Sequence, residues 1–289
     1  MKQINQLVHM TKSFESLKSI LKDGIHTSYN LEIFCAENIL VPMISFSNIL
    51  YRDIGEKEVV EYGSYAVVVE RDNFSKIFDL NPVSYFQENS TIAKGIKYNY
   101  ENALIPQILD DVKKFYLDTK GCCGTYLQNI AIKPLSEDAK SLINSIDENT
   151  SDSIINAYKR IFEKIFINSR NQILTSKPFK VNDKIGKEWI AYNEREWRKS
   201  YFDLNYIREF TPKGFINSKY DEIIKSRKPH LKEKEYSLQI PLSEIRNIIV
   251  TSTEEIQELR NFINFDLNKE IDCKLISTLE NLKKIESFK

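Results

Sequence analysis

Glycine is scarce in this sequence: 8 of the 289 residues are Gly, against about 7% in average proteins. The sequence contains neither G-x-G-x-x-G nor G-x-x-x-x-G-K-[ST]. Loops of these two kinds need glycine so that backbone N–H groups can approach a phosphate closely. The sequence therefore argues against a Rossmann or P-loop nucleotide site.

Cysteine, histidine and long apolar runs are also scarce. The four cysteines are Cys35, Cys122, Cys123 and Cys273, without a C-x-x-C motif, and the three histidines have no zinc-ligand spacing. We expect free thiols and no metal site. No apolar run reaches 18 residues, and the N-terminus lacks the apolar region of a signal peptide. These absences predict no membrane span and a cytoplasmic protein. The many Lys, Asn and Ile residues are typical of an AT-rich, bacterial genome.

The composition that remains is that of a folded globular protein. Hydrophobic residues make up 42% and charged residues 28% of the chain, and the formal net charge is zero. Residues 1–150 carry a net charge of −5 and the remainder +5. This mild asymmetry is not a nucleic-acid-binding composition, but it leaves room for a local basic surface. The segment richest in basic residues contains Lys213, Lys219, Lys225, Arg227, Lys228, Lys232 and Lys234.

Hydrophobic periodicity predicts strands and helices in the first hundred residues. Gln6–Met10 is strand-like, and the helix that follows has Ser13 as its N-cap and Gly24 as its terminating glycine. Ile39–Phe46 is strand-like around a proline, which suggests an edge strand or a bulge. Tyr65–Glu70 gives the clearest strand pattern in the chain.

The rest of the chain first becomes helical and then mixed. Amphipathic patterns over 103–117, 136–146 and 151–172 predict helices, and 188–198 and 235–251 predict strands. The last two segments, 253–265 and 274–287, predict helices, the first with a capping box. We therefore predict an α+β protein with a mostly antiparallel sheet. We expect one domain over 1–289, with a core of 1–100 and 176–251, a helical insertion over 101–175 and C-terminal helices over 252–289.

Three separated segments carry chemistry-bearing side chains. The first places His9 and Thr11 between a strand and a capped helix, and the second places Tyr62 and Tyr65 before a strand. The third is EREWR, at residues 194–198. In an extended strand Trp189 and Trp197 would share one face, and Glu194, Glu196 and Arg198 would share the other.

Each segment also has a purely structural interpretation. His9 is typical of a hydrogen-bonded histidine at the edge of a core, and the tyrosines are typical of core or hairpin aromatics. Glu194, Glu196 and Arg198 are typical of a surface ion-pair ladder. A function therefore depends on the three segments acting together.

Together the segments resemble a known family. The blocks HMTKSFESLKSILKDGI, VPMISFSNI, YGSYAVVV and EREWR resemble those of AbiGi-type abortive phage-infection proteins. The first block also resembles the opening strand and helix of DarT-like ADP-ribosyltransferases, which use His, Tyr and Glu in this order across a split sheet. The more remote resemblance implies a split sheet of the ADP-ribosyltransferase type.

This second resemblance implies NAD as substrate and assigns a role to each segment. His9 and Thr11 would hydrogen-bond the NAD ribose, and Tyr62 or Tyr65 would stack on nicotinamide. Glu196, or Glu194 in the other register, would be the catalytic carboxylate that stabilises an oxocarbenium-like charge.

Three functions follow as alternatives. The first is a phage-defence effector that transfers ADP-ribose from NAD to a macromolecular target, protein or nucleic acid. The second is a non-catalytic, antitoxin-like interaction module that binds a cognate partner in a two-component defence system. The third is a nucleic-acid-binding module that uses the basic segment over 213–234.

Overall fold

The computed structural model describes most of the chain outside a central stretch. The described residues are 5–34, 37–87, 90–102, 160, 164, 167–168, 170–178, 180–182, 188–190, 195–201, 204, 206–210, 215–226, 231 and 233–287. The predicted helices over 103–117 and 136–146, and most of the one over 151–172, lie outside them. The boundaries expected for a helical insertion therefore stay a prediction.

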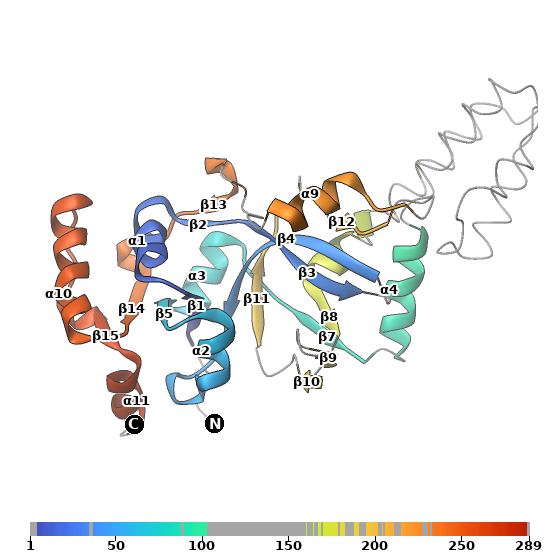
Figure 1. The fold of residues 1–289 in the computed structure, drawn as a ribbon. Coiled ribbons are helices and arrows are strands. Elements are labelled where there is room, and N and C mark those ends of the chain that lie inside the picture. The colour runs from blue at the N-terminus through green and yellow to red at the C-terminus, as the bar shows by residue number, and fades with distance from the viewer. Residues whose placement is uncertain are drawn as a thin grey trace, which may run out of the picture.

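The described residues form a mixed α+β fold around a nine-stranded sheet (Figure 1). Seven strands follow the order β15-β14-β5-β1-β4-β11-β6, and β3 and β12 both pair with β4. Every pairing in this sheet is antiparallel except that of β14 with β15. The prediction of an α+β fold with a mostly antiparallel sheet is confirmed.

The strands and helices have the following bounds. The strands are β1 (Leu7–Thr11), β2 (Ile25–His26), β3 (Ser28–Phe34), β4 (Glu37–Ser47), β5 (Tyr65–Val69), β6 (Asn81–Pro82), β7 (Ser84–Phe86), β8 (Ser176–Pro178), β9 (Lys180–Asn182), β10 (Glu188–Ile190), β11 (Glu196–Lys199), β12 (Ile207–Arg208), β13 (Ser237–Leu238), β14 (Ile245–Val250) and β15 (Ile276–Thr278). The helices are α1 (Phe14–Asp23), α2 (Glu56–Tyr62), α3 (Arg71–Phe78), α4 (Thr91–Asn102), α9 (Ser218–Ser226), α10 (Thr253–Asn261) and α11 (Leu279–Ser287).

The first strand and helix form where the local sequence predicts them. The Ser13 hydroxyl accepts a hydrogen bond from the Ser16 N–H and begins α1. Gly24 ends the helix at a φ of +86°, and its N–H donates to the Ile20 carbonyl. Gly63, at a φ of +108°, lies against the Thr11 carbonyl, where a Cβ atom would overlap the oxygen. Only glycine fits this close approach between the start of β5 and the end of β1.

Strand β4 is long enough to take part in both halves of the sheet. Its residues 37–43 pair with β3, residues 39–40 also pair with β12, and residues 44–47 pair with β11. Pro42 lies in the gap between the β12 and β11 partners, where a missing N–H breaks no pairing on that side. Pro42 thus has a described partner strand on one side only, as at an edge, although β4 as a whole lies inside the sheet, and the unbroken register with β3 contains no bulge.

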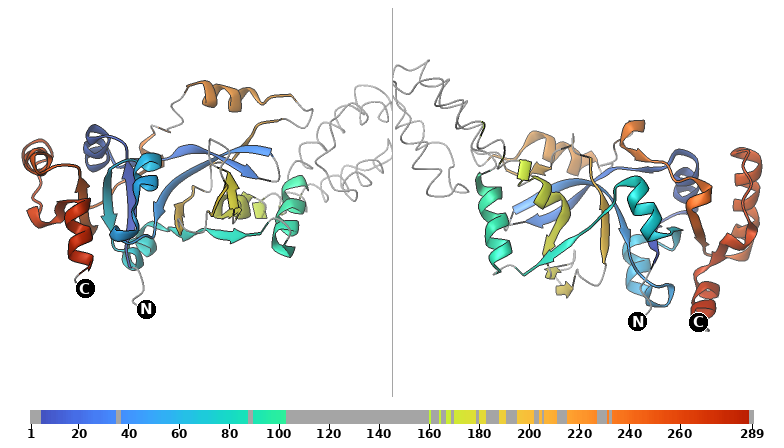
Figure 2. Two further views of the ribbon diagram at one scale, coloured as in Figure 1. Left: turned by 60° about the horizontal axis from the view of Figure 1, so that its bottom comes forward. Right: turned by 180° about the vertical axis from the view of Figure 1, so that it is seen from behind.

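Helices surround the sheet (Figure 2), and separate hydrophobic cores lie between these helices and the strands. The largest packs α1, α3 and α10 against β1, β4, β5 and β14, with fully buried Leu17, Val67 and Phe74 among its members. At the other end, α4 and the helical residues 173–174 cover one face of β4, and α9 covers the opposite face. Among the described residues, every helix is too short or too polar to traverse a bilayer.

The C-terminal segment contributes a strand as well as helices. Helix α10 begins at the predicted capping box, in which the Ser252 hydroxyl accepts from the Glu255 N–H and the Glu255 carboxylate accepts from the Ser252 N–H. The predicted helix over 274–287 begins only at Leu279, because 276–278 form β15. This parallel strand extends the central sheet beside β14.

The predicted strand over 188–198 is wrong as a single element. Residues 188–190 form β10, which pairs with β9 in a small separate sheet, and residues 196–199 form β11 in the main sheet. Arg195 has a φ of +44°, a left-handed conformation that ends any extended run just before β11. Trp189 and Trp197 therefore belong to different sheets and share no face.

Candidate functional site

Strand β11 places two ionic side chains in the interior. Glu196 and Arg198 lie two residues apart and so on the same face of the strand, and they are only 7% and 1% exposed. Trp197 points to the opposite face and packs, half-buried, against the largest core. The interpretation of this segment as a surface ion-pair ladder is therefore wrong, because the charged face is the more deeply buried one.

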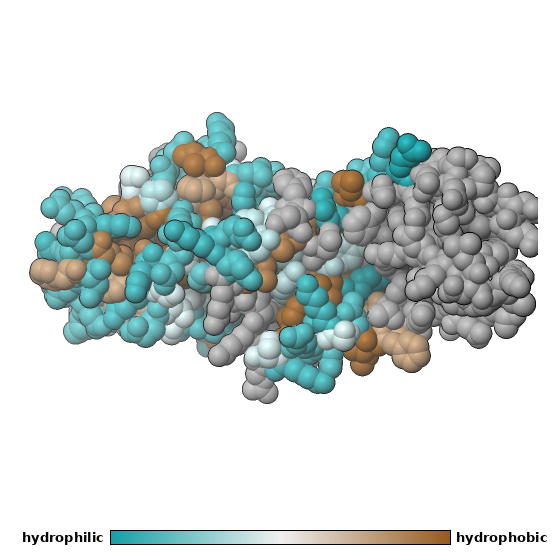
Figure 3. Space-filling model, turned by 90° about the horizontal axis from the view of Figure 1, so that it is seen from above, coloured by the Kyte–Doolittle hydropathy of each residue, from teal (hydrophilic) through white to brown (hydrophobic). Residues whose placement is uncertain are grey.

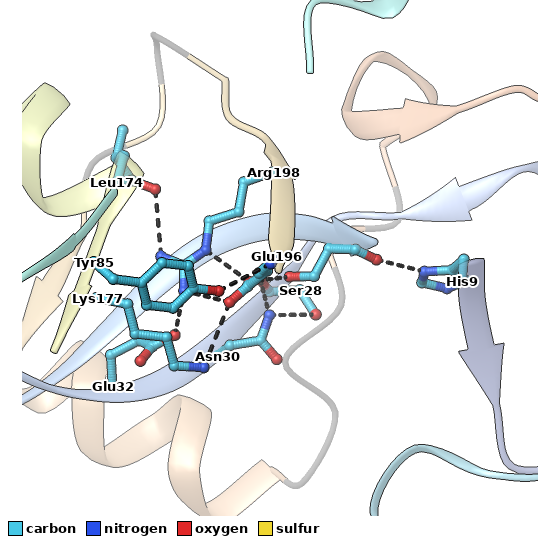
Figure 4. A network of polar contacts seen from close by, with 10 residues as sticks. His9, Ser28, Asn30, Glu32, Tyr85, Leu174, Lys177, Glu196 and Arg198 are labelled. Carbon is cyan, nitrogen blue, oxygen red and sulfur yellow. Dashed lines mark hydrogen bonds and ion pairs between the residues drawn. The ribbon is translucent and has the colours of Figure 1, made fainter. Parts of the chain in front are cut away.

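The Arg198 guanidinium is the centre of a buried ion cluster (Figure 4). Its Nε donates to Oε1 of Glu196 at 2.7 Å and its Nη2 to Oε2 at 3.1 Å, the bidentate geometry of an arginine–carboxylate pair. The same Nη2 donates to Oε1 of Glu32 at 2.6 Å. Lys177 adds a second cation, with its Nζ 3.4 Å from Oε2 of Glu196. The two acids and two bases come from β3, β8 and β11 and cancel in formal charge.

Every polar group of Glu196 is engaged. Oε1 accepts hydrogen bonds from Arg198 and from the Ser45 hydroxyl at 2.9 Å, and Oε2 accepts from Arg198 and Lys177. The backbone N–H donates to the Tyr85 hydroxyl, and the backbone carbonyl accepts from the Val83 N–H. This carboxylate is held in place by its neighbours on both oxygens.

The cluster favours the ionised forms of both central groups. Burial alone would raise the pKa of Glu196, but the charges of Arg198 and Lys177 and the hydrogen bonds to its oxygens together lower this pKa to about 2. Burial opposes the charge of Arg198 too, but the two carboxylates outweigh it and raise the pKa of the guanidinium. Both groups are thus charged over the whole physiological pH range.

Acid should destabilise the protein through Glu196. Its pKa is about 2 in the folded protein and 4.5 without these neighbours, so its contribution to stability is complete above about pH 4.5 and is lost as the pH falls toward 2. We expect the melting temperature of the wild-type chain to fall steeply over this window, and that of Glu196→Gln to start lower and fall less. Glu280→Gln, on an exposed side chain, should keep the wild-type slope. Equal slopes for the wild type and Glu196→Gln would contradict this assignment.

His9 lies next to the cluster through Ser45. Strand β4 runs between β1 and β11, so that the strands of His9 and Glu196 share one sheet, as expected from the matching blocks. The His9 Nδ1 lies 2.8 Å from the Ser45 carbonyl oxygen. Since a carbonyl only accepts, Nδ1 carries the proton. Burial lowers the pKa of His9 more than this hydrogen bond raises it, so the ring is neutral at pH 7.

The tyrosines lie elsewhere on the sheet. Tyr65 begins β5, opposite Thr11 of β1, and its hydroxyl donates to Glu255 at 2.8 Å. Glu196 on β11 pairs with Ser47 on β4, Ser47 with Val8 on β1, and Val8 with Val68 on β5. Val68 is therefore three strand spacings from Glu196 and directly opposite it across the sheet. Tyr65 is therefore about 14 Å across the sheet and about 10 Å along it from Glu196. Tyr62 ends α2, three residues before Tyr65.

The structure thus brings only part of the predicted site together. His9 and Glu196 flank Ser45, and Thr11 lies two residues from His9 on β1, whereas Tyr65 lies on β5 and Tyr62 ends α2. Glu194 lies outside the described residues, as do Lys213, Arg227, Lys228 and Lys232 of the basic segment. The described Lys225 is paired with Asp221 on α9. The assignment of these residues to NAD or nucleic-acid binding stays a prediction.

Three members of the cluster were not predicted from the sequence. They are Glu32, Lys177 and Ser45, and they reach Glu196 and Arg198 only through the pairing of distant strands. Glu32 carried a detectable signal, because it is the one acidic residue between Gly24 and Cys35, in an otherwise strand-like run. If such a charge is buried it must be paired, so Glu32 was a candidate for an ion pair.

Comparison with known proteins gives a family for this fold and site. Residues 26–251 match the family model described as "Putative abortive phage resistance protein AbiGi, antitoxin". The match includes β3, β4 and β11, which supply Glu32, Ser45, Glu196 and Arg198. Neither the comparison with curated proteins nor that with solved structures gives a match.

Proposed function

Because the chain belongs to the AbiGi family of abortive phage resistance proteins, we propose that it is the antitoxin of a two-component defence system. In this role it binds a cognate toxin and holds it inactive until infection. The function needs a stable, specific binding surface and no reaction. The observation that carries the proposal is the family match over most of the chain, whose description is that of an antitoxin.

The geometry around Glu196 supports a structural role for this residue. A catalytic carboxylate in ADP-ribose transfer must present an oxygen to a ribose hydroxyl. Both oxygens of Glu196 already accept two hydrogen bonds or ion pairs each. An NAD-bound arrangement would have to break part of this cluster and expose the buried Arg198, which is costly.

The competing hypothesis is the NAD-dependent effector. The observation in its favour is that Ser45 contacts both His9 and Glu196 on neighbouring strands: its carbonyl accepts from His9 and its hydroxyl donates to Glu196. Against it stands the distance of Tyr65 from Glu196, because one nicotinamide cannot stack on this ring and reach the carboxylate with its ribose. The two hypotheses predict different effects of the amount of the chain relative to the toxin. A binding protein neutralises one toxin molecule per chain, whereas one enzyme molecule modifies many target molecules.

The test is to express the chain alone and with graded amounts of the toxin from the same defence system. We expect the chain alone to leave growth unchanged and to restore growth only at about one chain per toxin. The purified pair should elute as a stable complex, and labelled NAD should remain unconsumed. Growth arrest by the chain alone, or rescue far below equal amounts with consumption of NAD, would instead establish the enzyme.

A further inference from the structure

Strand β3 has an outer edge that no other described strand covers. Residues 28–34 pair with β4 without a break, and β4 is their only partner among the described strands. The residue just before the strand is covered, because the Thr27 N–H donates to the Tyr236 carbonyl and the Thr27 carbonyl accepts from the Leu231 N–H. The open part of the edge is therefore the seven-residue strand itself.

The backbone groups of Tyr29, Leu31 and Ile33 point outward along this edge. In an antiparallel pair, successive residues direct their N–H and C=O alternately toward the partner and away from it. Thr27 directs both groups away from β4, so every second residue after it does the same. The far side of β4 gives the same result, because the Asn38 carbonyl, opposite Ile33, accepts from the N–H that follows β12 and so points away from β3. Within the described part of the chain, the outward groups of these three residues have no hydrogen-bond partner.

This edge lacks the features that normally protect one. Proteins keep edge strands from pairing by making them short or by placing lysine, proline or a bulge in them. At the ends of the seven-strand path, β6 has two residues including Pro82, and β15 has three residues. Strand β3 is longer, its register shows no bulge, and residues 28–34 contain no lysine, arginine or proline. Such an edge favours the addition of a further strand.

Two apolar side chains are left half-exposed on one face beside this edge. Leu31 and Ile33 are 53% and 51% exposed, whereas Leu40, opposite Leu31 on β4, is only 1% exposed. The buried Tyr29 lies on the same face of β3, because side chains alternate along a strand. In the view from above, hydrophobic residues form separate groups among hydrophilic ones (Figure 3). A partner at this edge therefore meets a narrow apolar row and not a broad apolar surface.

The other face of β3 carries an amide and a carboxylate. Oε1 of Glu32 accepts from Arg198 at 2.6 Å, and this guanidinium compensates the charge of the carboxylate. Oε2 of Glu32 accepts no hydrogen bond from any described residue. Asn30, two residues earlier, is exposed, and its amide donates only within β3, to Ser28. This face thus offers an amide donor beside a carboxylate acceptor.

On these grounds we infer that β3 pairs with β3 of a second copy of the chain, antiparallel about a two-fold axis at Leu31. Hydrogen bonds form across such an edge only where outward groups meet outward groups, and Leu31 is both an outward residue and the midpoint of the strand. In this register Leu31 lies opposite itself, and Tyr29 lies opposite Ile33 of the partner copy. Each outward residue then donates one hydrogen bond and accepts one across the axis.

The side chains match in the same register. The exposed Leu31 is covered by its own counterpart, and the exposed Ile33 packs beside Tyr29 of the partner copy. On the other face Asn30 lies opposite Glu32 of the partner copy, so that its amide can donate to the carboxylate oxygen that Arg198 leaves without a partner. The strand therefore complements itself in backbone, apolar and polar groups.

Other registers use less of the edge. An axis at Glu32 would leave Tyr29 without a partner in β3 and would place two carboxylates opposite each other, which is unfavourable. An axis at Asn30 would bring Ile33 of the partner copy against Thr27, whose outward groups are already hydrogen-bonded. This fit of β3 to itself favours a second copy over an unrelated segment, and two-fold interfaces are the commonest among homo-oligomers. The inferred dimer does not depend on the proposed antitoxin function.

The test measures self-association of the purified chain by sedimentation velocity over a range of micromolar concentrations. Leu31→Lys and Leu31→Glu each place like charges opposite each other at the axis, and each should weaken the dimer by at least about tenfold. In an equal mixture, opposite charges meet at the axis, so the two variants should bind each other at least about tenfold more tightly than either binds itself. Val60→Lys on α2, an exposed apolar position away from β3, should stay within about twofold of the wild type.

Hydrogen exchange followed by NMR gives a second readout. The amides of Tyr29, Leu31 and Ile33 should gain protection as the concentration rises, whereas those of Asn30 and Glu32, which point to β4, should be protected throughout. Melting temperatures near that of the wild type would show that the variants remain folded.

Four results would overturn the inference. They are a wild-type chain that stays monomeric, a dimer that Leu31→Lys leaves intact, a mixture of the Lys and Glu variants that gains no affinity, and edge amides that only added toxin protects. The last result would assign the edge to the toxin. None of the four would remove the proposed antitoxin function, which fails only if the wild type binds no toxin.

Discussion

Arg198→Ala is expected to lower the free energy of unfolding by about 3–5 kcal/mol. The substitution removes the cation that pairs with Glu196 and Glu32 and leaves a buried carboxylate with one ion-pair partner, Lys177, at 3.4 Å. A buried charge without its partner must either stay desolvated or take up a proton. Urea unfolding followed by circular dichroism measures the loss. A value within about 1 kcal/mol of the wild type would mean that the cluster is not held as described.

A combined substitution separates two contributions to the unfolding free energy: the cost of leaving a buried carboxylate without its cation, and the net stabilisation by the whole ion cluster. Replacing a whole buried ion pair by apolar residues is often neutral, because the desolvation cost disappears together with the attraction. We therefore expect Glu32→Leu, Glu196→Leu and Arg198→Met together to recover much of the stability lost in Arg198→Ala. Glu196→Leu with Arg198→Met alone should recover less, because Glu32 then stays largely buried without its cation.

Phe74→Ala should have an effect of similar size, about 3–5 kcal/mol. Phe74 is fully buried on α3, with its ring centroid 4.5 Å from that of Phe78 and 5.7 Å from that of Phe46. Removing the ring leaves a cavity between α3 and β4 and loses two aromatic contacts. The same urea measurement applies here.

The control for this prediction is Phe215→Ala, which truncates the same type of side chain at a largely exposed position. It should change the unfolding free energy by less than about 0.5 kcal/mol. Equal losses from Phe74→Ala and Phe215→Ala would show that α3 does not pack against the sheet as described.

Local chemistry made several elements predictable from the sequence. The hydroxyl of Ser13, the left-handed glycine at 24 and the Ser252–Glu255 box define helix ends by contacts within a few residues. The opposite faces of Trp197 and Glu196 follow from the alternation of any strand. The α+β class follows from the same patterns, because each depends on neighbours in sequence.

The tertiary structure alone decided which face of β11 is buried and which residues meet there. Glu32 and Arg198 are separated by 166 residues, and only the assembly of β3, β4 and β8 around β11 brings Glu32, Ser45 and Lys177 to Glu196 and Arg198. The break at Arg195 and the strand β15 also escaped prediction, since the first depends on a left-handed backbone and the second on a parallel partner, β14, earlier in the sequence. Residue type and spacing determine whether a side chain can carry a charge. Whether that charge is exposed, paired or free to act depends on distant strands, because burial and ion pairing arise only when the sheet is assembled.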